Sequence, residues 1–525
     1  MLRKFNACHQ YKRDFLKPGF FVYLNNRTQI LLSQTRSRIS AIRLFNAVLL
    51  PFFLGIMATF SHLPFGYVWL SLASFALFTL IWQKHTSTVA KTISGFSYAM
   101  GYFLVSLHWV GFFYLSSENP NVTFAVLSVL GVALYAALFW ASMLCVISLF
   151  PTRMADRAWL FGLAIPVADL LRTTLGQFPN AQFGYMWINT PLLQLASLGG
   201  VFLISLSVCL PTSLIIGKKY KSALLVMGLV SVGLYAANPE KVEFHEYRVA
   251  VIQHNAEQSL KWTDGYDVEL ENRLMQMALR AQIQNADLII APENAVTRLI
   301  NSGDPIFDRF RENLDIPILF GAPGTGDLGQ ISNSAFFYEP TLNSVQQYDK
   351  VHLAPVAEKS IVPWAHDSAS LFSGSNPAVF KTSIRIPNIA PLICYDGAFP
   401  IHGKSLPQRP DLLSIISADS LLGNFGALQA RDQASIRAVE TGIPVVRAAA
   451  TGISAIIGPD GSVLQVSGFD TRQILIHALP RTFAPTLFWK FGVQVDVGLI
   501  IMVLIGSAVV ACLRKTVTPR FGVFP

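Results

Sequence analysis

Eight long apolar runs separated by short polar connections are the feature that most constrains how this chain can fold. Seven lie within the first 237 residues and one lies near the C-terminus, at 42–60, 64–82, 95–115, 121–150, 158–174, 192–216, 221–237 and 494–513. A helix needs about 20 mostly apolar residues to cross the hydrocarbon core of a bilayer. We therefore expect a multi-span α-helical membrane domain with eight spans in all, of which those at 158–174 and 221–237 are short.

The composition agrees with this interpretation. Hydrophobic residues make up 52% of the 525 residues, charged residues only 14%, and the mean hydropathy is +0.44. An ordinary soluble protein carries about 25% charged residues. These values exclude a disordered chain, a collagen-like repeat and an ordinary cytosolic enzyme.

The charge of the short connections predicts the orientation of the spans. The N-terminal 43 residues and the connections at 83–94, 151–157 and 217–221 carry Lys and Arg, as does the C-terminal tail, whereas those near 61–63, 116–120 and 175–191 carry none. Cytoplasmic loops of membrane proteins are enriched in Lys and Arg. We therefore expect both termini in the cytoplasm and the large polar segment 238–492 on the outer side.

The formal charge of +9 belongs to the flanks of this polar segment. Residues 238–492 contain 20 Lys and Arg against 26 Asp and Glu, a net charge of −6, which leaves +15 for the rest. No basic stripe with interleaved aromatic residues indicates a nucleic-acid partner. We expect four parts, listed in chain order: a basic cytoplasmic extension over 1–43, a seven-span domain over 44–237, an extracytoplasmic domain over 238–492, and a last span with a cytoplasmic tail over 493–525.

One charged pair lies inside a predicted span. Asp169 and Arg172 are three residues apart near the end of the fifth apolar run. On a helix they would share a face and could pair. Charges within a membrane are often functional, and anchoring at the bilayer interface is the alternative.

The outer segment alternates short β-rich runs with helical stretches. Strands are predicted in "YRVAVIQHN", "ADLIIAPE", "IPILFGAP", "NSAFFYEP", "IAPLICYD", "DLLSIISAD", "GIPVVRAAA" and "SAIIGPDGSVLQ", and helices at 264–285, 304–313 and 427–440. Continuous apolar runs are typical of strands buried on both faces, so we expect a layered α/β domain. The Gly-rich "GAPGTGDLG" lacks the Lys-Ser/Thr of a phosphate-binding loop and is predicted to be a turn.

Three chemically capable side chains follow predicted strands. Glu293 ends "LIIAPE", Lys350 lies just past a strand in "QQYDKVHLAP", and Cys394 ends "APLIC". Because α/β folds tend to build sites at strand ends, these groups could converge. Cys394 is the only cysteine of the outer segment. Its position alone leaves open whether it is an inert buried side chain or a functional thiol.

Longer motifs relate the chain to a known family. They are "QSLKW" at 258–262, "APENA" at 291–295, "NSAFFYEP" at 333–340, "YDKVHLAPVAE" at 348–358, "ICYD" at 393–396, "IRAVETGIPVVRAAATGISAIIGPDG" at 436–461 and, in the apolar half, "GYMWINTPLLQLASLGG" at 184–200. With these motifs the outer domain resembles the nitrilase (carbon–nitrogen hydrolase) superfamily, and the whole chain resembles the apolipoprotein N-acyltransferase family of the bacterial inner membrane. The resemblance implies an αββα nitrilase-like sandwich in the periplasm.

The resemblance also implies roles for individual residues. The family's catalytic glutamate, lysine and nucleophilic cysteine fall on Glu293, Lys350 and Cys394. Supporting positions fall on Glu358, Tyr395 and Asp396, and a substrate-side tryptophan falls on Trp262. We further hypothesise that the segment 359–376, which includes Trp364, is a substrate-contacting lid that dips into the outer leaflet; an ordinary packed loop is the alternative.

Some positions depart from the family's usual pattern. Asp396 stands where the family usually has glutamate, "SADSLLG" at 417–423 has Leu421 in a stretch that usually contains aromatic residues, and Ala449-Ala450 replaces a Thr-Asn pair. The three predicted catalytic residues are intact. The departures therefore concern the surroundings of the site.

The implied reaction is a two-step acyl transfer. Cys394 would take an acyl chain from a phospholipid, expected to be phosphatidylethanolamine, and pass it from a thioester to the α-amino group of the diacylglyceryl-cysteine of an apolipoprotein. Glu293 would act as general base, and Lys350 would lower the thiol pKa and stabilise the oxyanion. We expect no metal or other cofactor, because this chemistry needs none and no Cys/His ligand spacing occurs. A membrane-anchored amidase or hydrolase with the same three residues, and a non-catalytic scaffold, are the alternatives.

Overall fold

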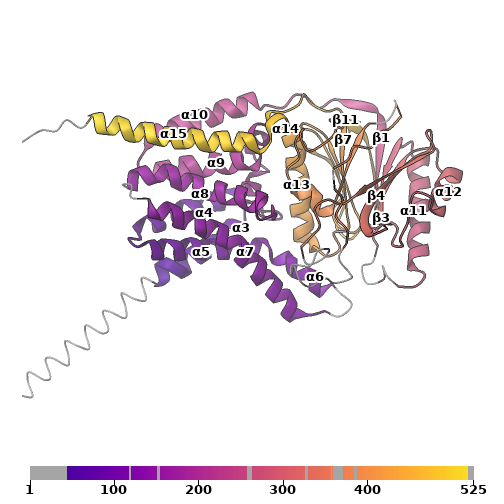
Figure 1. Cartoon of the computed structure of the whole chain (residues 1–525), viewed down its shortest axis with the longest axis horizontal. Helices are drawn as coiled ribbons and strands as arrows, with labels where there is room; N and C mark the ends of the chain where they lie inside the picture. The colour runs from indigo at the N-terminus through magenta and orange to yellow at the C-terminus, as the bar shows by residue number, and fades with distance from the viewer. Residues whose placement is uncertain are drawn as a thin grey trace, which may run out of the picture.

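The chain forms a helical bundle joined end-on to a layered α/β domain (Figure 1). The structure, a computed structural model, describes residues 44–116, 120–150, 154–256, 260, 263–325, 329–355, 358, 371–375, 377–383 and 387–517. The predicted extension 1–43 lies outside the described residues.

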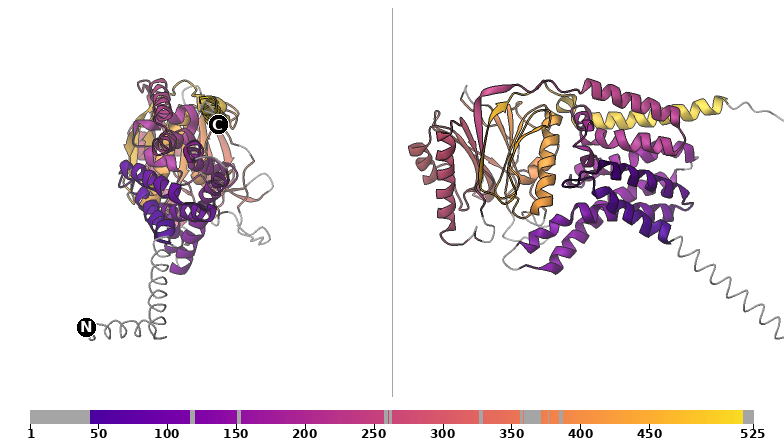
Figure 2. Two further views of the ribbon diagram at one scale, coloured as in Figure 1. Left: turned by 90° about the vertical axis from the view of Figure 1, so that its left-hand side faces the viewer. Right: turned by 180° about the vertical axis from the view of Figure 1, so that it is seen from behind.

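All eight predicted apolar runs are helical. The bundle consists of η1 (Phe45–Leu49), α3 (Leu50–Thr59), α4 (Val68–Lys84), α5 (Thr88–Ser106), η2 (His108–Gly111), α6 (Phe112–Leu115), α7 (Val122–Leu149), α8 (Met154–Thr174), η3 (Phe183–Trp187), η4 (Pro191–Leu195), α9 (Ala196–Ile216), α10 (Tyr220–Ala236) and, from the far end of the chain, α15 (Val493–Val517). The long helices lie side by side along one common direction (Figures 1 and 2), and α15 packs against α8 and α9.

Only some of these helices are long enough to cross a bilayer by themselves. Among the described residues, three are sufficiently long and apolar, at Val122–Leu149, Pro191–Ile216 and Val493–Val510. The bent pair Thr88–Ser106 and His108–Leu115 would make a fourth if it is one span. The predicted count of eight spans therefore stays a prediction.

The bundle core is held by stacked aromatic rings and close backbone contacts. The rings of Phe78 and Tyr98 stack with centroids 4.1 Å apart, which favours offset packing of two apolar helices. A Cβ atom at Gly55 would lie 2.0 Å from the carbonyl oxygen of Tyr98, and one at Gly101 would lie equally close to that of Phe52. The two glycines thus let α3 and α5 approach closely, as small residues do in membrane helices.

Two sheets form the centre of the α/β domain. Their strands are β1 (Phe244–Gln253), β2 (Leu288–Ile290), β3 (Ile318–Thr325), β4 (Ile331–Glu339), β5 (Ser344–Asp349), β6 (Ile389–Ile393), β7 (Leu412–Ser417), β8 (Val445–Ala449), β9 (Ala455–Ile457), β10 (Val463–Val466) and β11 (Gln473–Pro480). The six-stranded sheet has the order β11-β1-β2-β3-β4-β5, and the five-stranded sheet has the order β10-β9-β8-β7-β6. Strands β1, β2 and β3 are parallel, as are β6, β7 and β8.

Helices cover both outer faces of this sandwich. The remaining helices are α11 (Tyr266–Ile283), α12 (Pro305–Asn313), η5 (Cys394–Ala398), α13 (Gly423–Thr441) and α14 (Leu487–Phe491). Helices α11 and α12 pack on the six-stranded sheet, and α13 crosses between the five-stranded sheet and the bundle (Figure 1). Residues alternate along β1, so that Val251 faces the second sheet and Ile252 faces α11. The predicted αββα sandwich is confirmed.

Helix α13 is the main contact between the two halves. Ala434 and Ala438 pack on the five-stranded sheet, whereas Ile436 and Val439 belong to the core of the bundle. Because both faces are covered, α13 lacks the single apolar stripe of a surface helix. The α/β domain is therefore packed directly on the ends of the bundle helices.

Two local predictions need correction. Strand β11 was not predicted, because "QILIHALP" interrupts its apolar pattern with polar residues at a partly exposed sheet position. The glycine-rich segment was predicted to be a turn, but residues up to Thr325 continue β3. Gly321 is required for a different reason, because a Cβ atom there would lie 2.7 Å from the Cα atom of Glu293.

Candidate active site

Cys394 stands at a sharp turn between β6 and η5. Its φ of +48° lies in the left-handed region, which non-glycine residues seldom occupy and which often marks functional turns. The thiol is free and half-buried, and it packs against the core between the two sheets. The turn therefore places the sulfur at the carboxyl end of a parallel strand, as the sequence predicts.

Glu293 is held rigidly between the two sheets. It follows β2, and only 4% of it is exposed. Its Oε1 accepts a hydrogen bond of 2.6 Å from Nδ2 of Asn333, and its Oε2 accepts one of 2.7 Å from the backbone N–H of Ala418. Asn333 belongs to the six-stranded sheet and Ala418 follows a strand of the other sheet. Both carboxylate oxygens are therefore fixed by groups from different layers.

Lys350 follows β5 and points into the same space. Its Nζ lies 3.7 Å from Oε1 of Glu293 and 2.7 Å from Oε2 of Glu358. Nδ2 of Asn333 also donates to Glu358 over 2.8 Å. The amine thus lies beside two carboxylates that are bridged by one amide. Glu358 contacts the lysine as the predicted supporting role requires.

The charges determine the resting state of the thiol. The pKa of Cys394 is raised to about 12: burial is the largest cause and Glu293 adds to it, whereas Lys350 and a hydrogen bond with Ser417 act in the opposite direction. Burial disfavours a charged Lys350, but the nearby Glu293 and Glu358 outweigh this effect and hold the pKa of the lysine above its ordinary value. Near neutral pH the thiol is therefore protonated and the amine is charged. A thiol must lose its proton to react as a nucleophile, and two carboxylates, Glu293 and to a smaller extent Asp419, interact with the Cys394 thiol.

Asp396 fixes the turn that carries Cys394. Its Oδ2 accepts from the hydroxyl of Tyr348 at 2.9 Å and from the backbone N–H of Ile393 at 3.1 Å. Its Oδ1 accepts from the backbone N–H of His352 at 2.7 Å and lies 3.1 Å from the ring Nδ1. Both oxygens of this shorter acid are thus engaged, and they join η5 to the chain around β5.

Tyr395 joins the turn to the helical bundle. Its hydroxyl donates a 2.9 Å hydrogen bond to the backbone carbonyl of Gln177, in the connection that follows α8. Its ring packs edge-on against Phe399, with centroids 5.2 Å apart. The residue next to Cys394 is therefore tethered to a loop of the other half of the molecule.

The charged pair in α8 holds that same loop. Arg172 and Asp169 form a buried ion pair of 2.9 Å. Nη1 of Arg172 donates to the carbonyl oxygens of Phe178 at 2.9 Å and Asn180 at 2.5 Å, and Oδ2 of Asp169 accepts from the backbone N–H of Phe183 at 2.7 Å. The predicted pairing is confirmed. Its structural consequence is a fixed course for the connection that meets Tyr395.

Two further residues shape the site without having been singled out from the sequence. Asn333 begins the motif "NSAFFYEP" and bridges the two glutamates. Asp419, in "SADSLLG", accepts from the hydroxyl of Ser417 and forms a buried 2.8 Å ion pair with Arg447. The motifs contained these residues, but their roles depend on contacts between strands that are distant in the sequence.

Two predicted substrate contacts, Trp262 and Trp364, lie outside the described residues, as does most of the segment 359–376. Within the described part of the chain, no group of three or more His, Cys, Asp and Glu side chains is arranged to hold a metal ion.

Comparison with known proteins covers both halves of the chain. The family described as apolipoprotein N-acyltransferase N-terminal domain matches residues 54–214, and the carbon–nitrogen hydrolase family matches residues 248–484. The apolipoprotein N-acyltransferase of Haemophilus ducreyi is 29% identical over 489 residues, which cover 85% of this chain and 93% of that protein. The chain belongs to the apolipoprotein N-acyltransferase family.

Other members of the apolipoprotein N-acyltransferase family align over almost the whole chain. The Haemophilus influenzae protein is 26% identical over 534 residues, covering 94% of this chain and 99% of its own length. A solved amidase from Nesterenkonia sp. AN1 is 22% identical and covers 46% of this chain and 94% of that one, with a TM-score of 0.35. The predicted family and the predicted class of enzyme, an N-acyltransferase, are confirmed. The roles of the individual site residues stay predictions.

Proposed function

We propose that the enzyme carries an acyl chain as a thioester on Cys394, between a phospholipid donor and the α-amino group of the lipidated N-terminal cysteine of an apolipoprotein. Membership of the family supports acyl transfer with lipoprotein and phospholipid substrates in general. The observation that carries the assignment to these atoms is the buried arrangement of Glu293 and Lys350, 3.7 Å apart, around the thiol with which both interact electrostatically.

In the first half-reaction the Cys394 sulfur attacks the carbonyl carbon of the sn-1 ester. Its proton passes to Glu293, because a thiol whose pKa is raised needs a base at the moment of attack. Lys350 and the backbone N–H that follows the cysteine stabilise the tetrahedral oxyanion. The carbon–oxygen bond then breaks, the proton moves from Glu293 to the leaving oxygen, and a lysophospholipid departs.

In the second half-reaction the acyl group passes from the sulfur to an amine. The α-amino nitrogen attacks the thioester carbonyl carbon, Glu293 accepts a proton from the nitrogen, and the carbon–sulfur bond breaks as the sulfur regains a proton. An amide is more stable than a thioester, so this half runs downhill. Rigid placement of Glu293 by Asn333 and Ala418 keeps one carboxylate in reach of both proton transfers.

We also propose that the bundle crosses the bacterial inner membrane eight times, with both termini in the cytoplasm and the α/β domain in the periplasm. The connection 175–191 supports this placement, because it carries no Lys or Arg, as expected on the outer side, and it contacts the α/β domain. Gln177 accepts a hydrogen bond from Tyr395, and Asn180 accepts one of 2.8 Å from Gln433. The domain boundaries follow as 44–237 for seven spans, 238–492 for the catalytic domain and 493–525 for the last span and tail. In this placement the acyl chain never enters water, which would cost about 0.8 kcal/mol per CH₂.

The test is mass spectrometry of the protein after incubation with phospholipid and no acceptor. We expect a hydroxylamine-sensitive acyl adduct on Cys394 in the wild type, absent from Cys394→Ala, whose acyl transfer falls by at least about 10⁴-fold. An adduct that persists in the mutant contradicts the assignment. Comparing phosphatidylethanolamine with phosphatidylglycerol in the same assay tests the proposed donor, and free fatty acid released in place of acylated peptide would favour a hydrolase.

A further inference from the structure

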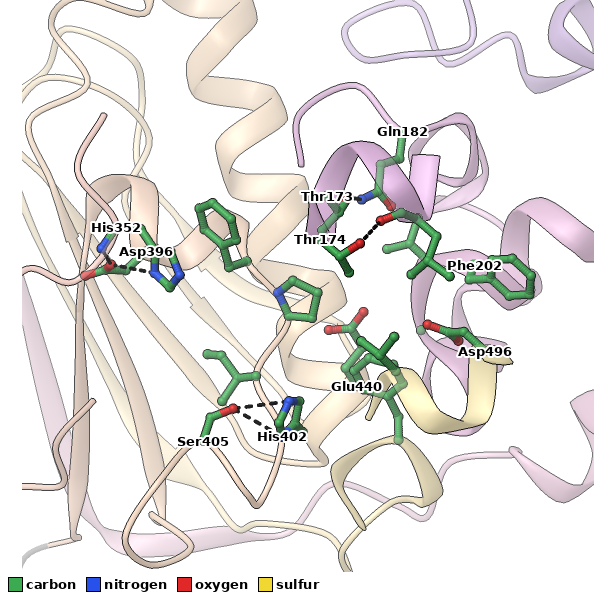
Figure 3. A pocket seen from close by; sticks show the side chains of 18 of the residues that line it. Thr173, Thr174, Gln182, Phe202, His352, Asp396, His402, Ser405, Glu440 and Asp496 are labelled. Atoms are coloured by element: carbon green, nitrogen blue, oxygen red, sulfur yellow. Dashed lines mark hydrogen bonds and ion pairs between the residues drawn. The ribbon is translucent and has the colours of Figure 1, made fainter. Parts of the chain in front are cut away.

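A cavity lies between the helical bundle and the α/β domain (Figure 3). Its volume is about 360 Å³, within the range of small-molecule sites. Helices α8, α9 and α15 line it from the bundle, and residues of η5, the loop after it and α13 line it from the other half. It reaches Asp396, but none of the three predicted catalytic side chains lines it. It is therefore a separate space.

Most of its wall is apolar. Apolar side chains come from both halves of the molecule and include Leu170, Phe202, Leu392, Ile401, Leu406 and Val493. Helix α15, which forms one side, is largely uncovered by protein, since only 11% of its apolar stretch Val493–Val510 is buried. The cavity thus borders a helix whose outer face we place in lipid. Such a wall suits the carbon atoms of a lipid.

Four buried carboxylates line the same space, and two of them, Asp169 and Asp396, have partners within the protein for both oxygens. The other two are Glu440 and Asp496. Glu440 is fully buried and Asp496 is 3% exposed, and both lie at the cavity in Figure 3. Among the described residues, neither Oε2 of Glu440 nor Oδ1 of Asp496 has a hydrogen-bond partner. A buried acceptor without a donor is costly, so these two oxygens indicate a ligand that brings N–H or O–H groups.

Glu440 is partly compensated within the protein. Its Oε1 accepts a 3.0 Å hydrogen bond from Arg437, and the backbone of Val201 contributes another. Val201 resumes α9 after a break at Gly200, where a Cβ atom would lie 3.3 Å from the same Oε1. The break lets the carboxylate of the α/β domain reach the bundle, while its second oxygen stays available.

The histidines that line the cavity do not supply a balancing cation. Burial lowers the pKa of His402, whose ring is hydrogen-bonded to Ser405. His352 is engaged by Asp396, whose two oxygens already have partners. Asp496 is then the acid of this cavity whose negative charge no neighbouring cation among the described residues neutralises. A buried carboxylate of this kind requires a cation or a proton.

The lining distinguishes between kinds of cation. A metal ion such as Ca²⁺ would need six or more oxygen ligands, whereas this wall is mainly carbon. A primary ammonium has three N–H donors on a carbon chain. We propose that the cavity binds a primary ammonium carried by a lipid, with Oε2 of Glu440 and Oδ1 of Asp496 as its acceptors. The inference rests on the proposed membrane placement and not on chemistry at Cys394.

Two lipids of this chemistry are relevant, the ethanolamine headgroup of a phospholipid and the free α-amine of a lipidated peptide. The test measures retention of ether-linked phosphatidylethanolamine and phosphatidylglycerol with matched chains by the full-length purified protein, using native mass spectrometry. Ether linkage prevents consumption of the donor. A second arm compares a diacylated lipopeptide with its N-acetylated form, which has lost the ammonium.

We expect the wild type to retain the ammonium form of one lipid pair at least about tenfold better, because charge-assisted hydrogen bonds have that strength. Asp496→Asn and Glu440→Gln should each reduce the preference toward parity, whereas Asp308→Asn, at an acid whose side chain is 64% exposed, should not. The responding arm identifies the source of the ammonium. Equal retention of both members of both pairs by the wild type overturns the inference, as does an undiminished preference in Asp496→Asn.

These outcomes are separable from those of the proposed function. Equal lipid retention by a wild type that still forms the Cys394 adduct would reject only the ammonium cavity. Headgroup preference that survives in Cys394→Ala, together with an adduct in that mutant, would reject only the proposed nucleophile. The wild-type comparison needs no variant, so it remains decisive if Asp496→Asn does not fold.

Discussion

The two sheets of the catalytic domain contribute different parts of the site. The six-stranded sheet supplies the charged groups, Glu293 and Lys350, and fixes them against each other through Asn333. The five-stranded sheet supplies Cys394 on a strained turn, and that turn is held by Asp396 and by the tether from Tyr395 to the bundle. In the proposed mechanism, proton transfer therefore depends on groups within the α/β domain, whereas the position of Cys394 also depends on the helical bundle.

Replacing Lys350 tests the charged side of this comparison and should have the largest effect. Lys350→Met removes an oxyanion donor and leaves Glu293 and Glu358 without their shared cation. We expect acyl transfer to fall by about 10³-fold or more, measured as kcat with a lipopeptide acceptor. Lys404→Met, at an exposed lysine, is the matched control. A loss below tenfold in Lys350→Met would contradict the assigned role.

Glu293 and Lys350 should shift the pKa of the Cys394 thiol in opposite directions, although both are proposed to support turnover. Burial and then Glu293 raise the pKa of Cys394, and Lys350 lowers it. The thiolate fraction at a given pH therefore rises in Glu293→Gln and falls in Lys350→Met. Iodoacetamide alkylation of Cys394, followed from pH 7 to 10, should show a profile shifted to lower pH in the first variant and to higher pH in the second.

The same Glu293→Gln variant should lose acyl transfer by about 10²- to 10⁴-fold, because it cannot act as a base. A thiol that reacts faster with iodoacetamide but more slowly with phospholipid would separate activation of the sulfur from proton transfer. Parallel changes in both rates would contradict the division of roles.

The ion pair in α8 tests the nucleophile side of the comparison. Arg172→Leu leaves Asp169 buried without its partner and releases the carbonyls of Phe178 and Asn180. Breaking a buried pair costs about 3–5 kcal/mol, whereas replacing both members by apolar residues is tolerated better. We expect a lower Tm and reduced acyl transfer in Arg172→Leu. The double variant, in which both Asp169 and Arg172 are replaced by Leu, should show a smaller loss of Tm. A double variant less stable than Arg172→Leu would contradict this.

Strand-end reasoning placed the main residues of the site, and contacts across the sandwich account for what it missed. Glu293, Lys350 and Cys394 each follow a strand, and this part was predictable because apolar runs show where strands end. The bridge by Asn333 and the requirement for Gly321 depend on which strands become neighbours. Pairing of β3 with β4 is a property of the folded sheet, and spacing along the chain does not contain it.

In the helical bundle, too, local features were predictable from the sequence and contacts between distant segments were not. Apolar runs predicted every long helix of the bundle, since burial in a bundle or in lipid needs only composition and length, whereas the short helix η3 in the connection 175–191 was not predicted. The pairing of Asp169 with Arg172 also followed from helical spacing. The bond from Tyr395 to Gln177 did not, because it joins residues 218 positions apart in separate halves of the molecule.

Removing that bond should give the smallest effect and the sharpest test of coupling between the halves. Tyr395→Phe deletes one neutral hydrogen bond to Gln177 and keeps the ring on Phe399. Such a bond contributes about 0.5–1.5 kcal/mol, so acyl transfer should fall by roughly 2- to 10-fold. If Arg172 acts by placing Gln177, the loss should shrink toward none when Tyr395→Phe is added to Arg172→Leu, measured as a double-mutant cycle on kcat. Fully additive losses would show that the bundle places the nucleophile by another route.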